Sequence, residues 1–175
     1  MSTDLNKGPF WILRDPHRCS GCRLCEVACT LRHEGKVWPE VSRIRILEPF
    51  PGIDIPHLCA QCPDYPCVKA CPLKALKVHP ETGAVTVDEG KCNGCGECFR
   101  ACPGGVPILH PEKKKALICD LCGGDPECVK VCALTGHHAL RLIPAKDRDL
   151  YRLYALNPEE QAKRLYETYY GEEVP

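Results

Sequence analysis

The sequence predicts a small α+β protein that is rich in loops. Its 175 residues include 16 cysteines, 17 prolines and 14 glycines, so much of the backbone is expected to form turns and loops. Leu, Ile, Val and Phe together make up less than a quarter of the residues, which is too few to bury a large apolar core. A chain of this length holds one domain or two small ones. Something other than aliphatic packing must therefore stabilise it.

The cysteines fall into four groups of four, with none left over. Groups one and three have the spacing C-x2-C-x2-C-x3-C, group two has C-x2-C-x4-C-x3-C, and group four has C-x2-C-x5-C-x3-C. The pattern is a degenerate repeat. In chain order, the groups are Cys19, Cys22, Cys25 and Cys29; Cys59, Cys62, Cys67 and Cys71; Cys92, Cys95, Cys98 and Cys102; and Cys119, Cys122, Cys128 and Cys132.

A short helix is expected at the end of each cysteine group. The last two cysteines of every group are separated by three residues, which places them one helical turn apart. The first cysteines of each group are expected in loops. The predicted helical stretches are Glu26–His33, Pro66–Cys71, Glu97–Cys102 and Pro126–Cys132.

Short strands are expected between these helices. Residues Arg43–Leu47 alternate polar and apolar side chains, which is typical of a strand. Ala75–Val78 and Ala84–Val87 flank a turn-forming segment with Pro and Gly, and this arrangement predicts a β-hairpin. Phe10–Leu13 and Leu140–Ile143 are expected to bring the two ends of the domain together.

Residues 144–175 contain no cysteine and are predicted to form a helical extension to a domain of residues 1–143. Asn157 and Pro158 form a helix start, with acidic residues in the first turn, and Gly171 is a natural stop. The predicted apolar face consists of Ala162, Leu165, Tyr166 and Tyr169. This face is expected to dock either on the chain's own domain or on a partner subunit, and both alternatives stay open.

The cysteines are interpreted as metal ligands because of the expected compartment. The N-terminus has no stretch that resembles a signal peptide, and no apolar run is long enough to span a membrane. We therefore expect a cytoplasmic protein without direct membrane insertion, in which thiols stay reduced. Sixteen cysteines in such a compartment indicate metal binding rather than disulfides.

The spacing of groups one and three is that of bacterial ferredoxins with two [4Fe–4S] clusters. Three cysteines at every third position allow a tight loop to wrap three corners of a cubic cluster, and the fourth cysteine reaches a different cluster. Four groups therefore predict four [4Fe–4S] clusters. The alternative is zinc, whose sites usually consist of two separated C-x2-C pairs. Group four is the least regular, so it is the first candidate for such an exception.

Three segments resemble a known family. They are HLCAQCPDYPCVKACPLKAL from His57, KCNGCGECFRACPGGVP from Lys91 and ICDLCGGDPECVKVC from Ile118. They are similar to the four-cluster electron-transfer subunits of molybdenum and tungsten pterin oxidoreductases, such as dimethyl sulfoxide reductase, formate dehydrogenase and nitrate reductase. The resemblance spans residues 17–143. It implies two pseudo-symmetric bacterial ferredoxin-like units, with groups two and three forming the middle unit and group four returning to group one.

The resemblance also implies which cysteines share a cluster, because each cluster takes three ligands from one group and one from the partner group. Thr30 and Ala133 stand where many relatives have proline, so the resemblance does not predict the backbone path there or the potentials of those clusters. The implied ligand sets are Cys19, Cys22, Cys25 and Cys132; Cys119, Cys122, Cys128 and Cys29; Cys59, Cys62, Cys67 and Cys102; and Cys92, Cys95, Cys98 and Cys71.

The implied function is an electron-relay subunit with a tungsten- or molybdenum-pterin catalytic partner. The compact group four is most similar to small subunits of tungsten aldehyde oxidoreductases, so an aldehyde oxidoreductase is the preferred partner. The alternatives are a tungsten benzoyl-CoA-type reductase and a formate dehydrogenase or sulfoxide reductase-like complex. A flavin, nicotinamide or ferredoxin protein is the expected further redox partner. The chain has no catalytic triad, paired catalytic carboxylates or dinucleotide motif, so it is predicted to be non-catalytic.

Two other function classes stay open, a free soluble polyferredoxin and a zinc-bound interaction scaffold. The 23 basic and 23 acidic residues balance, which excludes a strongly basic nucleic-acid binder. His17 and His57 each precede a cysteine group by two residues. Packing or surface roles are preferred for them, with adjustment of cluster potentials by hydrogen bonds to sulfur as the alternative. Lys113–Lys115 is interpreted as a solvated turn, with guidance of an acidic partner as the alternative.

Overall fold

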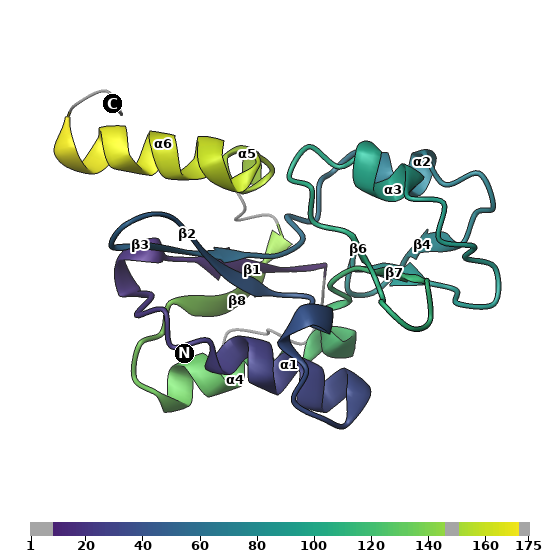
Figure 1. The fold of residues 1–175 in the computed structure, drawn as a ribbon, viewed down its shortest axis with the longest axis horizontal. Helices are drawn as coiled ribbons and strands as arrows, with labels where there is room; N and C mark the ends of the chain where they lie inside the picture. Colours follow the sequence, from purple (N-terminus) through teal and green to yellow (C-terminus); the bar gives the residue numbers. More distant parts are fainter. Residues whose placement is uncertain (1–8, 146–150, 172–175) are drawn as a thin grey trace.

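The structure is a computed structural model and describes residues 9–145 and 151–171. Figure 1 shows two lobes. In one lobe, two pairs of strands lie between a C-terminal helix on one face and two packed helices on the other. The second lobe holds shorter helices and strands from the middle of the chain. The α+β class is confirmed, and the pseudo-symmetry of the two units stays a prediction.

The two ends of the main domain pair as one antiparallel sheet. Strand β1 (Phe10–Arg14) pairs with β8 (Leu140–Pro144), and Leu13 lies opposite Arg141. Trp11 and Ile12 are buried. The predicted closure of the domain by these two segments is confirmed.

A hairpin forms the second sheet of this lobe. Strand β2 (Arg45–Phe50) pairs with β3 (Ile53–His57), and the turn contains Gly52 in the left-handed region, with a φ of 79°. The strand expected at Arg43–Leu47 therefore begins two residues later. Strand β3 was not predicted from the sequence, because Pro56 is unusual in a strand and the alternation of apolar and polar residues is limited to Ile53–Ile55.

A helix lies at the end of each cysteine group, as predicted, and contains the third cysteine of the group. Helices α1 (Leu24–Glu34) and α4 (Glu127–Leu134) pack together beneath β1 and β8 (Figure 1). The middle lobe has α2 (Pro66–Lys69) and α3 (Glu97–Arg100). Proline follows the last cysteine in groups two and three and stops those helices early. Thr30 and Ala133 take its place in α1 and α4, which continue beyond their last cysteines.

The middle lobe contains two small hairpins. The predicted one is confirmed as β4 (Leu76–Val78) with β5 (Val85–Val87). The other, β6 (Ile108–Leu109) with β7 (Ala116–Leu117), is too short to leave a pattern in the sequence. The lysine-rich turn between its strands is not only solvated, because the Lys113 ammonium pairs with the Glu34 carboxylate at 3.1 Å. This contact joins the two lobes.

Two helices follow the main domain, α5 (Tyr151–Tyr154) and α6 (Pro158–Tyr170). The predicted cap is confirmed: the Asn157 side chain accepts a hydrogen bond from the Glu160 amide at 3.0 Å, and Gly171 ends α6 with a φ of 67°. No helix among the described residues is long and apolar enough to cross a membrane.

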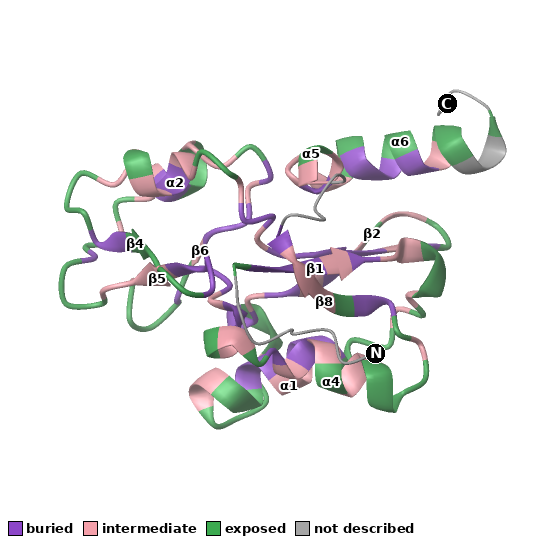
Figure 2. Cartoon of the chain, turned by 180° about the vertical axis from the view of Figure 1, so that it is seen from behind, coloured by how far each residue is buried: buried purple, intermediate pink, exposed green. Residues whose placement is uncertain are grey.

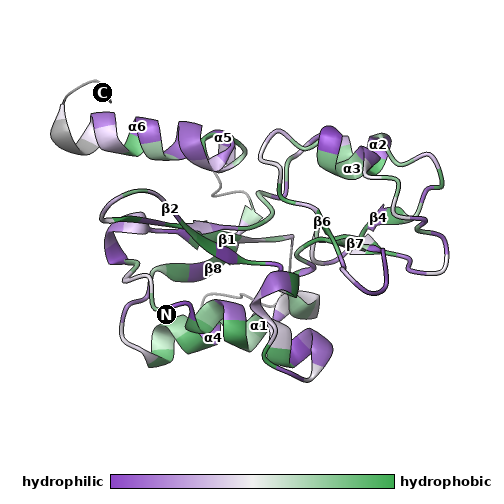
Figure 3. Cartoon of the chain, viewed as in Figure 1, coloured by the Kyte–Doolittle hydropathy of each residue, from purple (hydrophilic) through white to green (hydrophobic). Residues whose placement is uncertain are grey.

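The apolar face of α6 docks on its own chain. Ala162 and Leu165 are buried against Ile53 and Ile55 of the β2–β3 hairpin. Figure 2 shows the buried side of α6 turned toward β2, and Figure 3 shows a largely hydrophilic opposite side. The structure therefore matches the first of the two docking alternatives. The side chain of Tyr169, also expected on this face, lies outside the described residues.

Candidate iron–sulfur sites

The sixteen cysteines line four cavities, four to a cavity, and none forms a disulfide. These quartets are the same four sets that the family resemblance implies. We name the cavities as follows: site A has Cys19, Cys22, Cys25 and Cys132; site B has Cys29, Cys119, Cys122 and Cys128; site C has Cys59, Cys62, Cys67 and Cys102; and site D has Cys71, Cys92, Cys95 and Cys98.

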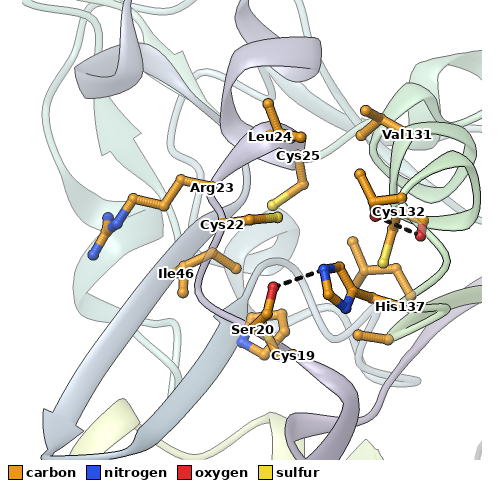
Figure 4. A pocket seen from close by; sticks show the side chains of 14 residues that line it. Cys19, Ser20, Cys22, Arg23, Leu24, Cys25, Ile46, Val131, Cys132 and His137 are labelled. Carbon is orange, nitrogen blue, oxygen red and sulfur yellow. Dashed lines mark hydrogen bonds between the residues drawn. The ribbon is translucent and has the colours of Figure 1, made fainter.

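Site A lies between α1, α4 and β2 and has a volume of about 350 Å³. Figure 4 shows the sulfur atoms of Cys22 and Cys25 on one side of the cavity and that of Cys132 on the other. At the rim, the Ser20 hydroxyl and the His137 Nε2 lie 2.9 Å apart. The loop needs glycine at position 21, because a Cβ there would lie 2.6 Å from Asp54 Oδ2. An acidic side chain therefore stands close beside this site.

Site B lies on the other side of the α1–α4 pair and has a volume of about 280 Å³. The Arg43 amide donates a hydrogen bond to Cys29 Sγ at 3.4 Å. His33 Nε2 lies 3.7 Å from Cys122 Sγ and 3.5 Å from Asp120 Oδ1. His33 was not singled out from the sequence, although it follows Cys29 by four residues, a spacing that places both on one helical face.

His33, Asp120 and Cys122 are close enough together to hold a metal ion. Cys122 also belongs to the four-thiol set of site B, so we interpret His33 and Asp120 as neighbours of that site rather than as a separate metal centre. The pKa of His33 is lowered by burial and by the Arg43 charge, against the opposing effect of Asp120.

Site C is the cavity of the middle lobe that faces the rest of the molecule, with a volume of about 420 Å³. The amides of Gln61 and Val106 donate hydrogen bonds to Cys59 Sγ and Cys102 Sγ at 3.4 and 3.5 Å. Tyr154 and Ala155 of the C-terminal segment also line this cavity. The extension therefore forms part of a cysteine site, which its sequence did not indicate.

Site D lies at the far end of the middle lobe and has a volume of about 320 Å³. The amides of Ala75 and Ala116 donate hydrogen bonds to Cys71 Sγ and Cys92 Sγ at 3.3 and 3.5 Å. Gly94 adopts a φ of 72°, and a Cβ at this position would lie 2.3 Å from the Lys114 carbonyl oxygen. Glycine is thus required where the cysteine loop passes the β6–β7 turn.

The sites lie in the order A, B, C, D. Helices α1 and α4 each contribute one cysteine to site A and one to site B, and α2 with its following turn links sites C and D in the same way. Sites B and C adjoin at Cys119 and Cys59, where the Gln61 side chain donates a hydrogen bond to the Cys119 carbonyl at 3.4 Å. Exposed cysteines occur at the two outer sites, Cys22 in A and Cys95 in D.

The donor chemistry of the cavities fits iron–sulfur clusters. Each cavity offers four sulfur atoms at its wall, among apolar side chains and backbone amides that face sulfur. Burial raises the pKa of the Cys25, Cys67 and Cys119 thiols to about 12. Four neighbouring thiolates are unfavourable in such surroundings unless a metal centre compensates their charge. Iron clusters bound by four cysteine thiolates meet this requirement.

Two side chains with basic groups, those of His57 and Arg14, are buried near the sites. His57 is 2% exposed, and burial together with the charges of Arg14 and Arg45 lowers its pKa to about 4. This agrees with the packing role preferred for it. Arg14 is also 2% exposed; the signal that could have found it is one cation directly after the apolar run Phe10–Leu13.

Comparison with known proteins agrees with the interpretation of these cavities as iron–sulfur sites. The model of the 4Fe-4S dicluster domain matches residues 53–140, and that of a 4Fe-4S binding domain matches residues 16–32. The polyferredoxin-like subunit of the aliphatic sulfonate oxidoreductase of Pyrococcus furiosus is 54% identical over 164 residues, which cover 94% of this chain and 95% of the relative. The putative electron transport protein YsaA of Escherichia coli is 36% identical, over 70% of this chain and 83% of its own.

Among solved structures, a chain of the active-site complex BamBC of benzoyl coenzyme A reductase with benzoyl-CoA is similar. It is 26% identical and covers 77% of this chain and 78% of its own, with a TM-score of 0.43, which is too low to support an argument. The dicluster model covers half of the chain, and the Pyrococcus relative covers nearly all of it. The chain belongs to the 4Fe-4S dicluster domain family and is a ferredoxin-like iron–sulfur protein of electron transfer.

Proposed function

We propose that this chain is the electron-relay subunit of an oxidoreductase complex, with one [4Fe–4S] cluster in each of sites A, B, C and D. The cysteines that line each cavity are its ligands. One observation carries the proposal: sixteen cysteines from distant parts of the chain form four quartets in a row, with exposed members only in the two outer quartets.

Each cluster, when bound, supplies one-electron transfer. The protein's part is to hold the four sites next to one another and to restrict water at the inner pair. Helices α1 and α4 fix the spacing of sites A and B, and Cys59 and Cys119 hold sites B and C in contact. Redox partners are expected to dock near Cys22 and Cys95, where sites A and D reach the surface.

The proposed catalytic partner is a tungsten- or molybdenum-pterin subunit that oxidises an aliphatic sulfonate. The support is the sulfonate oxidoreductase subunit of Pyrococcus furiosus, which matches this chain over nearly its full length. An aldehyde remains the second candidate substrate because of the compact spacing of group four. Two electrons removed from either substrate leave one at a time and reduce a flavin, nicotinamide or ferredoxin acceptor. We place the complex in the cytoplasm, where sixteen thiols stay reduced.

The test begins with the native complex, purified without oxygen. Metal analysis is expected to give about sixteen irons per copy of this chain. Deletion of its gene is expected to abolish substrate-dependent reduction of the distal acceptor, while the isolated catalytic subunit still reduces an artificial dye. Unchanged reduction of the natural acceptor in the deletion strain would disprove the relay role.

Substrate and alternative functions are separated by three further measurements. A short alkanesulfonate and a short aldehyde are added in turn, and the one that bleaches the visible cluster absorbance identifies the substrate class. Elution of the native chain near its own mass of 19.5 kDa would favour a free polyferredoxin. A colourless protein that contains zinc would favour the scaffold.

A further inference from the structure

Arg14 is a buried cation without an anionic partner among the described residues. It is 2% exposed and lies at the end of β1. Its Nη2 donates a hydrogen bond to the Cys59 carbonyl at 3.1 Å, but its Nε and Nη1 are buried without a hydrogen-bond partner in the described part of the chain. A buried charge is strongly unfavourable unless an opposite charge compensates it. Within residues 9–145 and 151–171, the guanidinium therefore has no compensating anion.

The guanidinium lies where sites B and C adjoin. Cys59 and Cys62 of site C and Cys119 of site B lie close enough to interact with its charge. Its position is fixed, because its Cζ lies 4.6 Å from the centre of the Tyr154 ring and the Tyr154 hydroxyl donates a hydrogen bond to the Arg14 carbonyl. An arginine side chain keeps its positive charge at neutral pH.

Two other arginines near these sites have acidic neighbours. Arg43 beside site B pairs with Asp120 at 3.0 Å. Arg45 donates a hydrogen bond to the Val106 carbonyl beside site C, and its charge interacts with Glu26. Site A has the Asp54 carboxylate close to it. At site D, the half-buried Lys115 ammonium donates a hydrogen bond to the Cys92 carbonyl. Arg14 differs from these cations because it is fully buried and has unpartnered nitrogen atoms within the described residues, and it lies at the centre of the row.

We propose that Arg14 is the counter-ion of the clusters in sites B and C and raises their reduction potentials above those of the outer sites. This inference rests on the proposed function. A cluster held by four thiolates is anionic, and reduction adds one more negative charge. A fixed cation in surroundings of low dielectric constant stabilises the reduced form more than the oxidised form. Electrons consequently reside preferentially at the centre of the relay.

The experiment is a potentiometric titration of the loaded complex, followed by electron paramagnetic resonance. The test variants are R14M, which fills the space without charge, and R14Q. R14K keeps the charge, and R141Q is the matched control, because Arg141 is exposed on β8 beside β1. In R14M and R14Q, two of the four midpoint potentials are expected to fall and two to stay. R14K is expected to lie close to wild type, and R141Q to equal it.

Four unchanged potentials in R14M, or an equal shift of all four, would overturn the inference. If the uncharged variants lose clusters, iron content decides. Loss of two clusters in R14M with full loading of R14K supports a counter-ion, whereas equal loss in R14M and R14K shows a purely structural role. The proposed function fails separately, if the wild-type chain itself does not bind four clusters.

Discussion

Cys25 and Cys29 lie one helical turn apart on α1 and line two different cavities, sites A and B. Cys128 and Cys132 repeat this relationship on α4. A helix thus joins two neighbouring sites through its covalent backbone, and the distance between the sites varies little as long as the helix stays folded. This is an effective way to hold a relay rigid in a chain with few aliphatic residues.

This arrangement predicts that substitution of either of the two cysteines on one helix disturbs a different cluster. C132S is expected to disturb the cluster of site A, and C128S that of site B, each with loss of up to about one quarter of the iron. Iron analysis with electron paramagnetic resonance checks this. The S20A variant, which changes the rim of site A without removing a thiol, is the control. Loss of the same resonance signal in both cysteine variants would contradict the assignment.

Gly94 and Gly96 form a matched pair at site D. Both have a positive φ, but a Cβ at position 94 would collide with the Lys114 carbonyl, whereas nothing lies within 4 Å of one at position 96. G96A is expected to cost about 1 kcal/mol for the left-handed backbone. G94A is expected to cost clearly more and to lower the cluster content of site D. Thermal bleaching of the visible absorbance measures both, and equal effects would refute the steric explanation.

The Glu34 carboxylate makes the contact between α1 and the β6–β7 turn dependent on pH. Burial raises its pKa, but hydrogen bonds from Lys113 and His110 outweigh burial and hold the pKa below its usual value. A lowered pKa in the folded state means that the contribution to stability is present above the unfolded pKa and is lost as pH falls through the folded pKa.

The E34Q variant tests the contribution of this ion pair to stability. It is expected to be less stable than wild type at pH 7, by about 1 kcal/mol because Lys113 is partly exposed. The difference is expected to shrink as the pH falls below 4.5, the usual value of a glutamate. Unfolding followed across this range measures it, with E112Q as the exposed control. If the difference in stability between E34Q and wild type grew as the pH fell, the pKa of Glu34 would be raised in the folded state and not lowered.

The docking of α6 predicts that an introduced charge releases the helix when it lies on the buried face but not when it lies on the exposed face. L165D is expected to cost about 2 kcal/mol of docking free energy, because the buried Leu165 side chain packs on the β2–β3 hairpin. Limited proteolysis should then cut within Pro158–Tyr170. K163D introduces the same side chain at an exposed position and is expected to leave the helix protected. Equal protection of both variants would show that this face does not hold the helix.

The cysteine spacing predicted the four helices because the three-residue separation of the last two cysteines is local and repeats in the sequence, whereas the assignment of cysteines to quartets was implied by the family resemblance. The β4–β5 hairpin and the Asn157 cap also depend on neighbouring residues, and both are confirmed. The β3 strand was missed because it alternates over only three residues, Ile53–Ile55, and contains Pro56. Arg14 was missed because its setting arises from a contact with Cys59, 45 residues away. The preference for an aldehyde oxidoreductase partner came from the resemblance of group four to one kind of small subunit, and it stays a prediction.

The pairing of β1 with β8 has a consequence for biosynthesis. Sites C and D take their cysteines from residues 59–102, whereas sites A and B need Cys19 to Cys29 together with Cys119 to Cys132. During translation the eight cysteines of sites C and D therefore emerge while the first cysteine group still waits for the last. Strand β1 can pair with β8 only after Leu140–Pro144 has left the ribosome, so the domain closes late in synthesis.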